Sequence, residues 1–190
     1  MKTDSIIEYI EKNLSEKRLR HTYGVRDTAV MLAEIYGEDK EKAETAALFH
    51  DMLKGRDSET LNAYVREFGL EDKYIDNPNL AHGKIAAILM ERDYGITDRD
   101  IINAVSYHTT GRAGMSLLEK IIYIADASEP GRNYPGVERL RSEMKTDIDS
   151  AVLAALESTI KLVSDEGKFL DDDTVKARDY LFRSRRLSNA

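Results

Sequence analysis

The pair His50-Asp51 is the first place in the chain where the residue types could bind a metal ion. Imidazole nitrogens and carboxylate oxygens are both good ligands for first-row divalent metals. Neighbouring side chains on a helix point about 100° apart, so both can reach one ion only where the helix ends or is distorted. Gly55 predicts such an end, since glycine is favoured just after the last turn of a helix.

A cation follows this pair at helical spacing. Lys54 comes one turn after His50 and would lie on the same face of a helix, where it could hold a phosphate beside a metal ion. A lone His-Asp pair on a helix is more often a chance dipeptide than a ligand pair. The metal interpretation therefore depends on the other histidines.

The chain has four histidines, and each falls on a predicted helix close to its apolar stripe. Any one of them alone is typical of a half-buried, hydrogen-bonded histidine. Their joint placement favours a site, because His50 and His108 fall near the ends of their helices and His82 near the start of one. Asp126 ends the most apolar predicted helix, where a buried carboxylate is costly unless it is paired or metal-bound. The fourth histidine is His21.

Helices are expected to position these residues, because the apolar positions recur at helical spacing and no segment alternates as a strand would. Thr97, Asp147 and Thr174 are predicted N-caps, and Ser116 with Glu119 predicts a capping box. The expected helices cover about 5–14, 16–36, 40–54, 58–68, 80–94, 98–108, 117–126, 137–144, 148–166 and 175–187. We expect an all-α fold with one domain over 1–190, a core over about 15–130 and additional helices over about 136–187.

Composition excludes several classes of protein. The chain has 190 residues, 33% of them charged, and a net charge of -7, which disfavours nucleic acid and anionic membranes as partners. It has no cysteine, so disulfides and thiolate-zinc sites are excluded and a reducing compartment is expected. No apolar run reaches membrane-spanning length, and the N-terminus lacks the apolar core of a signal peptide. We therefore expect a cytoplasmic location.

The ordered set of four histidines and two aspartates resembles the HD superfamily of metal-dependent phosphohydrolases. These all-helical enzymes carry a His…His-Asp…Asp signature, which His21, His50-Asp51 and Asp126 match in order. The intervening His82 and His108 match the subgroup that holds a second metal ion. The resemblance implies a single HD-domain helical bundle with additional C-terminal helices.

Other segments resemble one branch of that superfamily, the YqeK-type symmetrical bis(5′-nucleosyl)-tetraphosphatases of bacteria. The resemblance runs from about residue 15 to 187, and Ala127-Ser128 departs from it where the family has bulkier residues. It implies an acid-anhydride hydrolase that cleaves diadenosine tetraphosphate into two ADP. The segments that carry it are 50–55, 108–111, 129–132 and 134–137.

The resemblance also implies a role for each site residue. Two metal ions would be bound, the first by His21, His50, Asp51 and Asp126, the second by His82 and His108, with Asp51 bridging. These ligands suit transition metals, with iron expected and manganese, cobalt, nickel or zinc as alternatives.

Substrate contacts are implied outside the metal ligands. Asp51, Lys54 and Arg132 would be catalytic, and Lys54 and Arg132 would hold phosphates together with Thr109 and Thr110. The alternative for Lys54 and Arg132 is ordinary solvation at the surface. The implied partner is a nucleotide, with no nucleic acid and no membrane, and a homodimer is left open.

Two other functions remain open at this point. One is another HD-type nucleotide phosphohydrolase or phosphodiesterase with the same ligands, against which the segment 129–137 favours the tetraphosphatase. The other is a catalytically inactive nucleotide-binding sensor. The complete set of metal ligands argues against that sensor, since lost catalysis is expected to leave the set incomplete.

Overall fold

The fold is all-α, which confirms the prediction from periodicity. The computed structural model describes residues 2–188, and within that range it contains no strand. No helix of this range is long and apolar enough to cross a membrane. The elements in chain order are α1 (Lys2–Asn13), α2 (Glu16–Tyr36), α3 (Lys40–His50), α4 (Ser58–Glu67), the 3-10 helix η1 (Asp72–Tyr74), α5 (Pro78–Tyr94), α6 (Arg99–Ser106), α7 (Leu117–Ser128), α8 (Val137–Glu143), α9 (Ile148–Asp165) and α10 (Asp172–Ser188).

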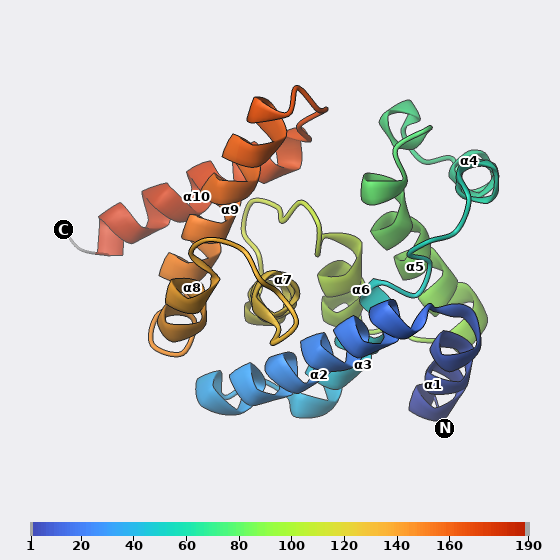
Figure 1. The fold of residues 1–190 in the computed structure, drawn as a ribbon, viewed down its shortest axis with the longest axis horizontal. Coiled ribbons are helices and arrows are strands. Elements are labelled where there is room, and N and C mark those ends of the chain that lie inside the picture. The colour runs from blue at the N-terminus through green and yellow to red at the C-terminus, as the bar shows by residue number, and fades with distance from the viewer. Residues whose placement is uncertain (1, 189–190) are drawn as a thin grey trace.

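Helix α7 is the central element, as its apolar sequence predicts. It packs against α2, α3, α6, α8 and α9, and Figure 1 shows it in the middle of the molecule. Leu118, Ile121, Ile122 and Ile124 are fully buried there. Its first turn has the predicted capping box between Ser116 and Glu119. A side chain near the end of α7 is therefore held by a helix that is buried in the core.

The end of α3 differs from the prediction. The helix ends at His50, and residues 51–55 form turns instead of a last helical turn before Gly55. Asp51 has φ -110° and ψ 17°, outside the helical region, so its side chain no longer follows the helical 100° step. This departure lets His50 and Asp51 face the same space.

Three other helix boundaries also differ from the prediction. Asp98, not Thr97, caps α6 by accepting hydrogen bonds from the amides of residues 100 and 101. That helix ends at Ser106, so His108 lies in the following turn. Helix α10 begins at Asp172, with Asp171 accepting from the amide of residue 173, so Thr174 lies inside the helix. In both caps an ionised carboxylate, a stronger acceptor than a hydroxyl, takes the position.

Candidate metal centre

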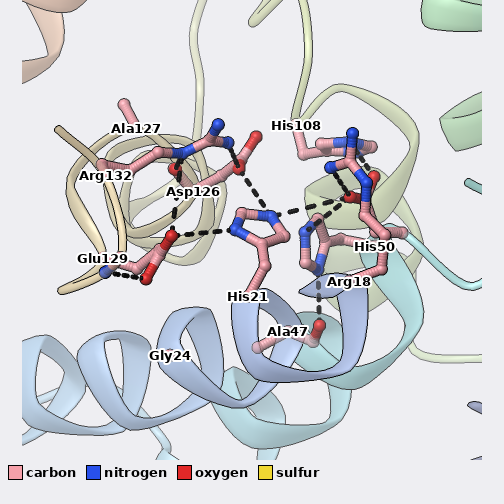
Figure 2. Close-up of polar contacts among 12 residues, drawn as sticks. Arg18, His21, Gly24, Ala47, His50, His108, Asp126, Ala127, Glu129 and Arg132 are labelled. Atoms are coloured by element: carbon pink, nitrogen blue, oxygen red, sulfur yellow. Dashed lines mark hydrogen bonds and ion pairs between the residues drawn. The ribbon is translucent and has the colours of Figure 1, made fainter. Parts of the chain in front are cut away.

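The structure brings all six predicted ligands to one place. His21 comes from α2, His50 and Asp51 from the end of α3, and Asp126 from the last turns of α7. His82 comes from the first turns of α5 and His108 from the turn after α6. Figure 2 shows the side chains of His21, His50, His108 and Asp126 converging from these elements.

Asp51 lies at the middle of the cluster, and each of its carboxylate oxygens faces a different pair of histidines. Oδ2 lies 3.6 Å from Nε2 of His21 and 3.8 Å from Nε2 of His50. Oδ1 lies 3.0 Å from Nε2 of His82 and 3.8 Å from Nε2 of His108. Two buried groups with metal-ligand spacing result, and they share Asp51. Asp126 adjoins the first group, with Oδ1 at 3.2 Å from Nε2 of His21.

Each of the four imidazoles is oriented by a contact at Nδ1. For His50, His82 and His108 the partner is a backbone carbonyl oxygen, which can only accept, so Nδ1 carries the proton and Nε2 keeps its lone pair. These Nδ1–oxygen distances are 2.5 Å to Ala47, 3.0 Å to Pro78 and 2.7 Å to Val105. Such partners fix ring orientation and tautomer in metal sites.

At two of these rings the lone pair of Nε2 has no hydrogen-bond donor among residues 2–188. The buried Nε2 atoms of His21 and His50 make no hydrogen bond. Nε2 of His82 and Nε2 of His108 lie 3.0 Å apart, and in the tautomers set by their carbonyl partners neither carries a hydrogen. Two facing lone pairs repel, and a shared cation would remove that repulsion. The donor set therefore fits bound transition-metal ions.

Electrostatics hold most of these groups in the state that a metal ligand needs. Burial lowers the pKa of His50, and it lowers the pKa of His108 to about 3, so both rings stay neutral. Burial also acts against the charged form of Asp126, but the close contact with His21 and the charge of Arg132 outweigh burial and lower the pKa of Asp126. His21 is the exception, because Asp126 and Glu129 outweigh burial and raise its pKa.

Glu129 is a candidate site residue to which the sequence assigned no role. Its side chain is 5% exposed, and Oε1 lies 3.1 Å from Nδ1 of His21. Oε2 accepts a hydrogen bond of 2.5 Å from the amide of Gly131. A Cβ atom at Gly24 would lie 2.7 Å from Oε2, so the absence of a side chain there makes room for Glu129. Figure 2 shows Glu129 between α2 and the loop after α7.

A second missed residue is Arg18, whose Nη1 donates to Asp51 Oδ2 at 3.3 Å. Arg18 and Gly24 each lie three residues from His21 in α2, on the same face of that helix. This spacing was the only sequence signal for either residue. It becomes informative only once His21 is placed in the site.

The predicted phosphate-binding residues lie next to the ligands. Arg132 donates from Nε to the carbonyl oxygen of Asp126 at 2.7 Å and from Nη2 to its Oδ1 at 2.5 Å. Burial lowers the pKa of Lys54, an effect opposed by the nearby charges of Asp51 and Asp126. Thr109 Oγ1 lies 3.1 Å from Nε2 of His108. Arg132 therefore contacts a predicted metal ligand directly, in addition to any contact with a substrate.

Thr110 has a different environment. It is buried, and its hydroxyl donates to the carbonyl oxygen of Gly111 at 2.9 Å. Its side chain lines a cavity separate from the one into which the metal centre opens.

A cavity of about 950 Å³ adjoins the metal centre between α7, α8 and α9. Its volume falls in the upper part of the range of small-molecule sites, roughly 300–1,000 Å³. Its lining includes His108, Asp126 and Arg132 of the site, together with Tyr134 and Lys161. A small molecule bound in this cavity can therefore contact the predicted metal-binding residues directly.

The sequence and the structure both match known proteins. The HD domain model matches residues 18–131, and the chain therefore belongs to the HD-domain family. Within that family, it is 38% identical over 182 residues to the symmetrical bis(5′-nucleosyl)-tetraphosphatase of Halalkalibacterium halodurans, covering 95% of this chain and 97% of that protein. The protein of the same name from Bacillus subtilis is 37% identical over 95% of this chain and 98% of its own length.

A solved structure has the same fold. It is the crystal structure of a Clostridium acetobutylicum protein described as a predicted HD superfamily hydrolase involved in NAD metabolism. The two chains share 48% sequence identity and a TM-score of 0.90, over 95% of this chain and 97% of that one. The family membership and the fold class expected from the residues are thus confirmed.

Proposed function

We propose that the protein hydrolyses diadenosine tetraphosphate symmetrically and releases two molecules of ADP. The observation that carries this proposal is the position of Asp51, with one oxygen facing each pair of histidines beside the 950 Å³ cavity. Relatives that align over nearly the whole chain bear the name of this activity. The resemblance of the chain to these relatives and the geometry of its site therefore support the same reaction.

The proposed cofactor is a pair of transition-metal ions, with iron first and manganese, cobalt, nickel or zinc as alternatives. His21, His50, Asp51 and Asp126 would hold one ion, and His82 and His108 the other, with Asp51 common to both. When bound, such a pair supplies Lewis-acid stabilisation of phosphoryl oxygens and lowers the pKa of water.

Residues next to the metal-binding side chains would hold the phosphates of the substrate in place. The guanidinium group of Arg132 has five N–H donors. Two of them, at Nε and Nη2, donate to Asp126, so the other donors can bind a phosphate. Lys54 would add a second cation beside Asp51, and Thr109 a hydroxyl beside His108. In the reaction, an oxygen from water bonds to a phosphorus next to the central bridging oxygen. The bond to that bridging oxygen breaks, and the second ADP leaves with it.

The proposed function is tested by assaying metal-loaded protein against a panel of nucleotides and phosphomonoesters and identifying every product. We expect turnover of diadenosine tetraphosphate with ADP as the sole product. Preference for another nucleotide would favour a different HD-type phosphohydrolase. Tight nucleotide binding without turnover by metal-loaded protein would favour the sensor and overturn the enzyme assignment.

Three further features belong to the proposal. We place the protein in the cytoplasm, because it lacks cysteine and its proposed substrate is a nucleotide. We retain one domain, with a core over about 15–130 and additional helices over about 136–187. A homodimer also stays a prediction, which light scattering on the purified protein tests.

A further inference from the structure

A second cavity, of about 480 Å³, lies between the segment that leads into α5 and the end of α9. Figure 1 shows α5 and α9 on opposite sides of the loop that follows α6. All three parts of the chain contribute to the lining, among them Asn77, Asn79, Thr110, Val163 and Phe169. Its volume is also within the range of small-molecule sites, roughly 300–1,000 Å³.

The two cavities share two lining residues, one of which lies next to the metal centre. Thr109 and Thr159 line both of them. Thr109 also contacts His108, with Oγ1 at 3.1 Å from Nε2. A chain of phosphates at the metal centre could therefore continue into either cavity, one on each side of the two threonines.

The charges of the second cavity suit a nucleoside better than a phosphate. Lys73 is paired with Asp171 at 3.1 Å, and Lys168 is paired with Glu166 at 2.5 Å, so both cations are already balanced. Phe169 lines this cavity and is 58% exposed. A base can stack on such a ring, and the amides and hydroxyls of the lining can hydrogen-bond to the edges of a base or a ribose.

The larger cavity is the better place for the half of the substrate that is held firmly. It contains Arg132 and also Arg139 and Lys161, and it reaches Asp126 at the metal centre. A symmetrical dinucleotide has a second, identical half on the other side of the phosphorus that reacts. That half needs space beyond Thr109, where the second cavity lies.

We propose that the 480 Å³ cavity binds the nucleoside of the departing half of the dinucleotide, with Phe169 stacking on its base. This inference rests on the proposed function. It predicts that the protein distinguishes a dinucleotide from a mononucleotide by contacts at Phe169, since a mononucleotide fills only the larger cavity.

The test is titration calorimetry on metal-loaded protein with two ligands. One is the analogue of diadenosine tetraphosphate in which a methylene group replaces the central bridging oxygen, which cannot be cleaved there. The other is ADP. In Phe169→Ala we expect about tenfold weaker binding of the analogue, as for loss of one base–aromatic stack, with binding of ADP unchanged. Phe169→Tyr keeps the ring and should bind both ligands as the wild type does.

Phe182→Ala is the matched control, because Phe182 is 47% exposed on α10 and does not line the second cavity. It should change neither affinity. Equal affinity of wild type and Phe169→Ala for the analogue would overturn the second subsite, as would parallel losses for both ligands. Turnover of the unmodified dinucleotide by the wild type is measured separately. The proposed function can therefore fail or stand independently of this subsite.

Discussion

Oε1 of Glu129 lies 3.1 Å from Nδ1 of His21, which points Nε2 of the imidazole toward Asp51 and Asp126. Replacing Glu129 by alanine removes this support, and we expect metal affinity to fall by about 10- to 100-fold, as for other partners of metal-binding histidines. Glu129→Gln keeps an oxygen acceptor, so its metal affinity should fall less. Competition with a chelator measures the affinity, and circular dichroism checks the fold.

Gly24→Ala tests the same contact without changing the carboxylate. The new Cβ would lie 2.7 Å from Oε2 of Glu129 and should displace its side chain, so metal affinity should fall here too. Glu138→Ala, at an exposed position of α8, is the control and should bind metal normally. Wild-type metal affinity in both Glu129→Ala and Gly24→Ala would contradict a positioning role for Glu129.

Lys54 and Arg132 should respond differently to mutation. Lys54→Met is expected to lower turnover at least tenfold with normal metal content, because the lysine would act on phosphate alone. Arg132→Ala should lower turnover and also weaken metal binding, since Arg132 holds both a side-chain and a backbone oxygen of Asp126. Parallel elemental analysis and steady-state assays separate the two effects. Full activity of both variants would remove these residues from the site.

The stability of the metal-free protein should depend on pH in two opposite ways. The pKa values of His50 and His108 are lowered from 6.5 by burial, so the unfolded chain binds more protons and stability rises with pH up to about 6.5. The pKa of His21 is raised above 6.5, so its contribution is complete below 6.5 and is lost as pH rises through the raised value. Stability should therefore peak near pH 6.5.

Thermal melts of chelated protein over a pH series measure this peak. His21→Gln should abolish the decline on the alkaline side and leave the rise on the acid side. A melting temperature that keeps rising through pH 8 in the wild type would contradict the raised pKa of His21.

The buried charge of Lys84 is expected to lower the free energy of unfolding at neutral pH. It is 9% exposed in α5, with Nζ 3.3 Å from the centroid of the Tyr107 ring, and burial lowers its pKa to about 8. Between about 8 and its ordinary value of about 10.4, the unfolded chain binds more protons, so stability rises with pH there. Lys84→Met should therefore raise the free energy of unfolding by on the order of 1 kcal/mol at pH 7 and by less at pH 10. Urea unfolding at the two pH values measures the difference, and a gain independent of pH would argue against this titration.

The helices and the family signature could be recognised in the sequence because both leave local signals. Helical periodicity and caps identify α2, α7 and α9, and the ordered histidines and aspartates match a family signature. The exact ends of helices are weaker signals. Gly55 suggested the end of α3, but the chain leaves the helix at Asp51, where the side chain must turn toward the other ligands.

The contacts among distant residues could not be predicted in the same way. Glu129 and His21 are 108 positions apart, and nothing in the local pattern of either segment indicates that they meet. The acceptors at Nδ1 of His50, His82 and His108 are backbone carbonyls, which every residue has. The two cavities arise where α9 faces the turn after α6, and periodicity does not say which helices face each other.

The most direct test of the proposed reaction is the fate of oxygen when metal-loaded protein cleaves diadenosine tetraphosphate in oxygen-18 water. We expect ADP as the only product, with one oxygen-18 atom in one ADP of each pair, because water adds to a phosphorus beside the central bridging oxygen. AMP together with ATP would place the attack on another phosphorus and contradict symmetrical cleavage. No turnover at full metal occupancy would contradict the enzyme assignment itself.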